Sequence, residues 1–225
     1  MQGFHNGICN VIAQKGSNIQ VVYLNLLNKN TKNFYVMNNK VEEDASLEYI
    51  ITELGGKISI TNNYINSAEK GANAKINAIY IGENEKLIDL NYIVEAYGEK
   101  SNIDINVCGA LQDKSQKNFK GTIDFKKGCK KSKGNENEYC MLLSKHAKSK
   151  ALPMILCNEE EVQGNHSNSA GKIDSQKLYY LMTRGISEQE AKKLIVKTHF
   201  SKITKRIHCR RVQKEIIQEI DGRLK

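Results

Sequence analysis

Cysteine is the residue type in this 225-residue chain that offers the most for metal or redox chemistry. The six cysteines are Cys9, Cys108, Cys129, Cys140, Cys157 and Cys209. Thiolates are preferred ligands of soft metal centres, but free cysteine is also among the most frequently buried residue types. The six are widely spaced and form no Cys-x-x-Cys pair, so no dense disulfide framework is predicted. We expect free thiols in a reducing compartment.

The composition indicates a globular protein with a buried core. Hydrophobic residues make up 40% of the chain, whose length allows one large domain or two small ones. No apolar stretch reaches about 18 residues. The first residues lack the charged and apolar regions of a signal peptide. We therefore expect a cytoplasmic protein without a membrane partner.

Short apolar–polar alternations from Ile8 to about Cys157 predict strands. Period-two alternation with many β-branched residues, bounded by Asn, Gly, Asp and Lys, is typical of them, as in Ile103-Asp-Ile-Asn-Val. About a dozen strands are expected, which suits either a solenoid or a β-sandwich. Asn and Gly tolerate the left-handed corners of a β-helix, but the spacing of the strands does not decide between the two architectures.

The pattern changes after Gly171 to that of amphipathic helices. Asp174 or Ser175 is expected to cap a first helix that Gly185 ends. A capping-box pattern, Ser187-Glu-Gln-Glu190, then starts a second helix. On the second helix, one face is predicted to carry Ala191, Leu194, Ile195 and Thr198. On a third helix, one face is predicted to carry Val212, Ile216, Ile217 and Ile220.

Several segments carry a resemblance to a known family. The stretch Arg184-Gly-Ile-Ser-Glu-Gln-Glu-Ala191, after a Leu-Tyr-Tyr helix, resembles the signature that closes the β-helix of SufB and SufD proteins. Further similar segments are Ala78-Ile-Tyr-Ile-Gly, Leu87-Ile-Asp-Leu-Asn, Phe119-Lys-Gly-Thr-Ile, Cys140-Met-Leu-Leu-Ser, Leu152-Pro153 and Gly164-Asn-His166. The resemblance implies a mainly β protein. Residues 1–172 would form a right-handed parallel β-helix, and residues 173–225 a small C-terminal all-α domain that docks an ABC-type ATPase.

The resemblance also implies a function without catalysis by the chain itself. A SufB/SufD-like scaffold would assemble and transfer nascent iron–sulfur clusters in a SUF-type complex with a SufC-like ATPase. No Walker motif occurs in the chain, so the ATPase must be a separate subunit. Larger family members carry an N-terminal helical region, whereas this chain enters the β-helix at once. We therefore expect a minimal scaffold that forms a homodimer through its C-terminal strands, with a cysteine desulfurase or another sulfur donor as a further partner.

The resemblance places a site for a transient iron–sulfur cluster near the last strands. In a gap-free alignment the cysteine implicated in B-type members falls at Glu138, two residues before Cys140. Side chains two apart on a strand point to the same side, so both could address one site. His166 occupies the family's histidine position, and Cys157 could supply a further thiolate. Clusters need soft anionic ligands, with imidazole or carboxylate as weaker partners.

Structural roles for some of these residues stay open. Cys108 and Cys129 match no family site and are expected to be structural. Cys157 lies in an otherwise apolar strand, so burial and ligation remain alternatives for it. Ser167 stands where B-type members have an acid, so a complete ligand set does not transfer from the family.

The resemblance implies that the residues docking the ATPase lie on the first two helices and on the turn between them. They are Leu178, Leu181, Arg184, Ile186 and Leu194. Their apolar side chains would have to serve both the core and the partner, with basic residues at the rim.

The sequence offers two other function classes. The net charge is +9, of which +7 belongs to residues 173–225, so nucleic-acid binding by the C-terminal helices is the main alternative. No helix-turn-helix or RNA-binding signature accompanies this charge. A polysaccharide hydrolase or lyase would need clustered carboxylates. The consecutive residues Glu159 to Glu161 do not converge on a strand.

Overall fold

The computed structural model describes residues 2–224 and contains two six-stranded parallel sheets. The first sheet consists of β1 (Gly3–Ala13), β3 (Thr31–Val41), β5 (Ile58–Ser67), β7 (Leu87–Ala96), β9 (Gln116–Phe125) and β11 (Lys148–Cys157). The second consists of β2 (Asn18–Asn25), β4 (Ser46–Glu53), β6 (Asn73–Gly82), β8 (Asn102–Leu111), β10 (Lys133–Leu142) and β12 (Gln163–Lys172).

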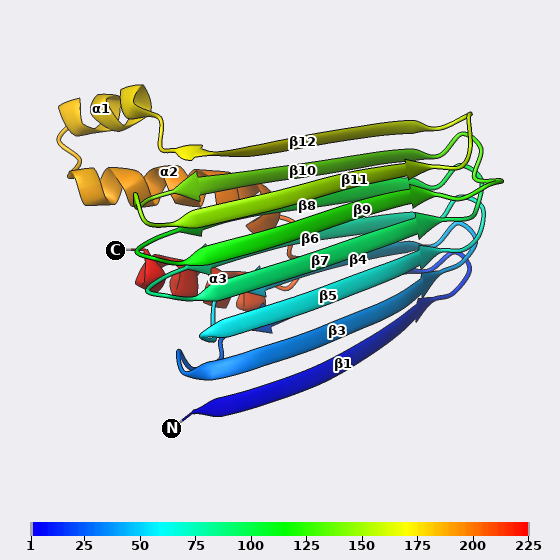
Figure 1. The fold of residues 1–225 in the computed structure, drawn as a ribbon, viewed down its shortest axis with the longest axis horizontal. Coiled ribbons are helices and arrows are strands. Elements are labelled where there is room, and N and C mark those ends of the chain that lie inside the picture. The colour runs from blue at the N-terminus through cyan, green and yellow to red at the C-terminus, as the bar shows by residue number, and fades with distance from the viewer. Residues whose placement is uncertain (1, 225) are drawn as a thin grey trace.

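Successive strands alternate between the two sheets, so each turn of the chain adds one strand to each (Figure 1). Every strand pairs in parallel with the strand two positions away in the sequence. This connectivity is a β-helix of about six turns and excludes the sandwich alternative. The predicted fold class is confirmed: twelve strands, where about a dozen were expected, are followed by three helices.

Several corners of the β-helix use left-handed backbone conformations, as the Asn and Gly content predicted. Asn84 and Asp113 both have positive φ, and a carboxylate oxygen of Asp113 accepts a hydrogen bond of 2.7 Å from the Asn84 amide. Lys100 and Lys131 also adopt positive φ, although lysine is not a typical residue for it. Such corners place successive turns of the chain above one another.

The interior between the sheets holds a continuous apolar core. Alternate residues of each strand point inward, and the largest buried aromatic side chains are Tyr49, Tyr80, Tyr92, Phe119 and Phe125. Gly109 is required beside one of these rings, because a Cβ atom there would lie 2.0 Å from the Tyr80 ring. The position of the Tyr80 hydroxyl therefore depends on a glycine in the neighbouring strand.

Three helices follow β12: α1 (Ser175–Thr183), α2 (Glu188–Thr204) and α3 (Arg210–Arg223). The predicted caps are confirmed, since Asp174 accepts hydrogen bonds from two amides of α1 and the Ser187 hydroxyl accepts one of 3.3 Å from the Glu190 amide. Gly185 ends α1 with a φ of 84°. Within the described residues, none of the helices has the length and apolar character to cross a membrane.

Helices α2 and α3 pack against the outer face of the second sheet rather than forming a core of their own (Figure 1). A second apolar cluster joins them to that sheet. Its buried members are Ile50, Leu54, Ile79, Ile81, Cys108, Ala110, Met141, Ile195, Val196, Phe200, Ile203, Ile207, Ile216, Ile220 and Leu224.

The buried face of α2 differs from the predicted one. Ala191 and Ile195 are buried as expected, but Leu194 is 43% exposed and Thr198 is also exposed. Val196 and Phe200 are buried instead, because the sheet covers a stripe rotated from the one that the sequence pattern suggested. The prediction for α3 is closer. Ile216 and Ile220 are buried there and Val212 is partly buried, while Ile217 is 37% exposed.

A candidate metal centre at the open end of the β-helix

The predicted site lies on β10, one strand from the end of its sheet. Glu136, Glu138 and Cys140 alternate along β10, are all buried, and point into the interior of the β-helix. The prediction that Glu138 and Cys140 share one side of the strand is confirmed. Strands β11 and β12 are the last in their sheets, and no strand within residues 2–224 covers them on the far side.

Glu138 is already paired with a buried cation. The Lys117 ammonium forms an ion pair with it, and the side chains are only 0% and 2% exposed. The Tyr80 hydroxyl donates a hydrogen bond of 3.1 Å to the same carboxylate, and Lys117 also donates to the Lys150 carbonyl oxygen at 3.1 Å. Buried ion pairs are costly to break, so this carboxylate is not free to bind metal in this state.

Cys140 is fully buried in the same network. Burial raises the pKa of its thiol, although the nearby Tyr80 and Ser149 hydroxyls and the Lys117 charge act in the opposite direction. A cysteine binds a cluster as its thiolate. Cys140 could therefore bind iron and sulfide only after the last strands move and the thiol loses its proton.

His166 does not meet Cys140 within one chain. It is exposed on β12 and pairs in register with Glu136, whereas Cys140 pairs with Ala170. Four residues along a strand correspond to about 13 Å. The two predicted ligands are therefore separated along the strands of a single chain.

Cys157 lies far from Cys140. It is the last residue of β11, in register with Phe125, and is exposed. Figure 1 shows that β10 and β11 run in opposite directions in the two sheets. Cys140 lies near the C-terminal end of β10 and Cys157 at the C-terminal end of β11, so the two thiols lie toward opposite ends of the strands. Cys129 is buried in the corner near Cys157.

Cys108 is buried on the outer face of β8, in the cluster with the helices, and burial raises the pKa of its thiol to about 12. These observations agree with the structural role predicted for Cys108 and, from its burial, for Cys129. Within the described residues, no three His, Cys, Asp or Glu side chains converge as a metal cluster would require.

Glu136 is a site residue that the sequence analysis missed. Its side chain is fully buried, and neither carboxylate oxygen has a hydrogen-bond partner. Gly121 of the facing strand makes room for it, because a Cβ atom there would lie 2.4 Å from the carboxylate carbon. Burial, with a smaller contribution from the Glu138 charge, raises the pKa of Glu136 to about 7. The same period-two rule that joined Glu138 and Cys140 could have identified it.

Comparisons with known proteins agree with this architecture. Residues 1–199 match the family described as "SUF system FeS cluster assembly, SufBD core domain". The chain belongs to the SufBD family.

Curated relatives lead to the same assignment for this SufBD family chain. An iron–sulfur cluster assembly SufBD family protein of Pyrococcus horikoshii is 32% identical over 160 residues, covering 70% of this chain and 35% of the relative. The iron–sulfur cluster assembly protein SufD of Bacillus subtilis is 24% identical over 182 residues, covering 81% of this chain and 42% of SufD. The chain thus spans less than half the length of these relatives.

The residues predicted to dock an ATPase lie on α1, on the turn after it and on α2. Leu178 and Leu181 are partly buried and pack toward the cluster between the helices and the sheet. Ile186 is also partly buried, while Arg184 and Leu194 are exposed. The structure does not test the docking itself, which stays a prediction.

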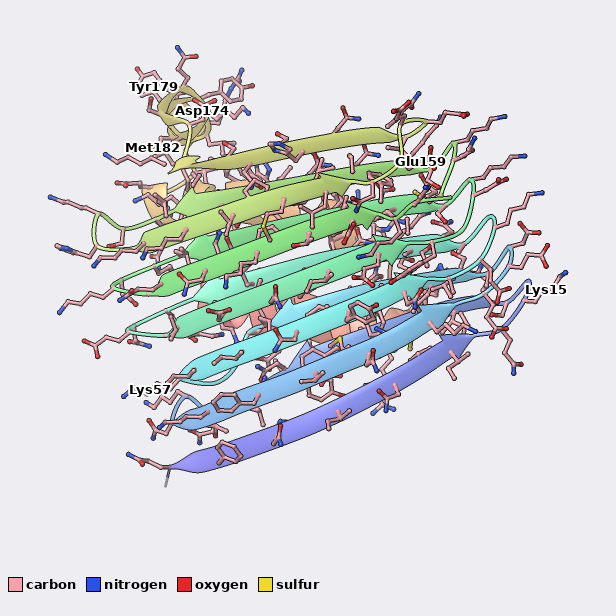
Figure 2. The ribbon with its side chains drawn as sticks, turned by 45° about the vertical axis from the view of Figure 1, so that its right-hand side comes forward. Lys15, Lys57, Glu159, Asp174, Tyr179 and Met182 are labelled. Carbon is pink, nitrogen blue, oxygen red and sulfur yellow. The ribbon has the colours of Figure 1, made fainter. Side chains whose placement is uncertain are left out.

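Helix α1 carries exposed apolar side chains that the sequence analysis did not select. Tyr179 is 70% exposed, Tyr180 58% and Met182 42%. Figure 2 shows Tyr179 and Met182 on α1, and Figure 1 shows that α1 lies beyond the end of β12. These three side chains and the exposed Leu194 of α2 are here called the α1 surface.

The unpartnered carboxylate predicts a pH-dependent stability. A buried carboxyl with a folded-state pKa of about 7 binds a proton more tightly than it does in the unfolded chain, where the pKa is about 4.3. The free energy of unfolding therefore falls as the pH rises from about 4.3 to about 7. We expect Glu136→Gln to be about 1–3 kcal/mol more stable than the parent at pH 8 and nearly equal to it at pH 4.5, by urea unfolding without metal. An equal difference at both pH values would contradict the ionisation argument.

Proposed function

We propose that this chain is a scaffold subunit of a SUF-type complex, in which it assembles nascent iron–sulfur clusters and transfers them with the help of an ABC-type ATPase. The observation that carries the proposal is the buried thiol of Cys140 on the same inner face of β10 as Glu136 and Glu138, one strand from the end of the sheet in a SufBD core domain. A thiolate with a carboxylate, and with an imidazole from a second copy of the chain, is a ligand set suited to a transient cluster.

The burial of Cys140 explains why such a scaffold would need an ATPase. Helix α1 begins three residues after β12 ends, so a force on α1 acts on the last strand almost directly. In the proposal an ATPase binds the α1 surface, and ATP hydrolysis moves β12 away from β10. This movement exposes Cys140 to iron, to sulfide and to the acceptor of the finished cluster.

A homodimer through β11 and β12 would complete the ligand set. The edges of both strands are unpaired within residues 2–224, and such edges offer amides and carbonyls to another strand. Leu152, Met154 and Leu156 are exposed on the outer side of β11. A twofold axis brings the same patch of two copies together. Cys140 of one copy and His166 of the other could then act on one cluster, although they are far apart along the strands of one chain.

Mixed dimers test the shared site. We expect Cys140→Ala and His166→Ala homodimers to fail in cluster assembly, because each lacks one ligand at both sites. A heterodimer with one substitution in each chain keeps one complete site of the two, so it should regain about half of the parent's cluster content per dimer. The measurement is bound iron and sulfide after differential tagging and purification. Mixed dimers that stay inactive, while both variants fold and dimerise, would show that the two residues do not form a shared site.

The nucleic-acid alternative is weakened by the ion pairs of the C-terminal helices. Arg206 pairs with Glu48 at 2.6 Å and Arg223 with Glu83 at 2.9 Å, so acidic residues outside the helices neutralise part of their +7 charge. Phosphate binding by the remaining cations would fall steeply as salt rises, which a titration with DNA at two salt concentrations would detect.

A further inference from the structure

Within residues 2–224, the interior near the open end of the β-helix holds two buried carboxyl groups but one buried cation. Two buried carboxylates, Glu136 and Glu138, lie two residues apart on β10. The single buried cation beside them, Lys117, is bound to Glu138. Glu136 has no hydrogen-bond partner on either oxygen. A buried carboxylate without a partner carries a large desolvation cost, so this position is suited to a further positive charge.

The neighbouring strand supplies a side chain that binds metal cations. His166 lies directly beside Glu136 in the register of β10 and β12. Side chains in register on parallel neighbours point to the same face, and the strands are about 4.8 Å apart. Carboxylate oxygen and imidazole nitrogen both bind first-row divalent metals at about 2.1 Å, so side chains at this spacing can share one ion.

In a single chain, the site is open to solvent at the edge strand β12. His166 is exposed, and no strand within residues 2–224 follows β12. Gly121 leaves the space on the facing strand that the Glu136 carboxylate occupies. An ion bound by His166 at the rim would therefore contact Glu136 at the boundary of the interior. Because only two ligands of the metal ion would come from the protein, water would complete its coordination shell. Such an ion exchanges with solvent more readily than one held by protein ligands alone.

We propose that Glu136 and His166 of the same chain form a binding site for a divalent first-row metal ion, Fe²⁺ in the context of cluster assembly. That the ion is iron on its way to Cys140 rests on the proposed function, whereas the binding site itself does not. Iron would be held here before sulfide arrives, and the opening of the last strands would bring it within reach of the thiolate.

Binding of Mn²⁺ alone tests the site without sulfide, ATPase or cluster. Free Mn²⁺ gives an electron paramagnetic resonance signal that is lost on binding, so untagged protein can be titrated directly, with Fe²⁺ added anaerobically as a competitor. We expect one ion per chain and at least a ten-fold weaker affinity in Glu136→Gln and in His166→Gln. Glu161→Gln is the matched control, because it removes the same charge from an exposed residue in the corner before β12 and should bind as the parent does.

Two outcomes overturn the inference: no Mn²⁺ binding by the parent, or unchanged affinity in Glu136→Gln, which would assign the ion to surface carboxylates. Cys140→Ala separates the inference from the proposed function. This variant should keep Mn²⁺ binding while losing cluster assembly. If the parent assembles a cluster but Glu136→Gln binds Mn²⁺ normally, only the metal-site inference fails. If the site binds Mn²⁺ but no cluster forms, only the proposed function fails.

Discussion

Replacing Cys140 with alanine should remove nearly all of the visible charge-transfer absorption that forms when the protein is reconstituted anaerobically with iron and sulfide. Cys140 is the only cysteine of β10 and lies on the same inner face as Glu136 and Glu138. Carboxylate and imidazole are weak cluster ligands without a thiolate. The measurement is the absorption spectrum together with iron and sulfide per chain.

Two cysteine variants serve as controls for this prediction. Cys108 lies beneath the helices on the outer face of β8, and Cys129 lies in the corner near Cys157. Alanine at either position should leave cluster loading nearly intact. An unchanged spectrum in Cys140→Ala would contradict the assignment of Cys140 as a cluster ligand, and the site would then lie at Cys157 or not exist. Loss of cluster loading in a folded Cys108→Ala or Cys129→Ala variant would contradict the structural role of that cysteine.

The largest expected effect on stability belongs to Lys117→Met. The substitution keeps most of the buried volume but leaves Glu138 in the interior without its cation. Removing one partner of a buried pair typically costs about 3–5 kcal/mol, because the remaining charge is uncompensated. We expect a loss of this size in the free energy of unfolding, measured with urea at pH 7. Lys130→Met removes an exposed partner of Glu161 and should leave the unfolding midpoint nearly unchanged.

The double variant Lys117→Met with Glu138→Gln isolates the cause. It removes both charges, so much of the lost stability should return. The Lys117 ammonium lies 5.8 Å from the ring centroids of Tyr80 and Phe119. If the double variant is as unstable as Lys117→Met alone, the loss of stability comes from these ring contacts rather than from the buried charge.

Much of the fold was predictable from the sequence because its signals are local. The alternation in segments such as Ile103-Asp-Ile-Asn-Val depends on neighbouring residues, as do the caps at Asp174 and Ser187. The choice between solenoid and sandwich is not local. Asn77 and Asn106, for example, stack across strands and are 29 residues apart in the sequence. Only the resemblance to a family supplied that information.

The site was predicted in part for the same reason. The common orientation of Glu138 and Cys140 follows from the period of a strand, and the structure confirms it. The pairing of Glu138 with Lys117, from the facing strand, and the register of His166 with Glu136 depend on how the turns stack. The buried face of α2 was assigned incorrectly at Leu194 because the sheet, which the helix pattern does not encode, determines which side is covered.

The central claim is that this chain is a cluster scaffold working with an ATPase, and anaerobic co-purification with a co-expressed SufC-like ABC-type ATPase tests it most directly. We expect the complex to contain the ATPase subunit together with iron and acid-labile sulfide, and to lose the ATPase in Leu194→Asp, which charges the α1 surface at an exposed position. A folded chain that purifies without the ATPase, and that contains neither iron nor sulfide after reconstitution, would contradict the account.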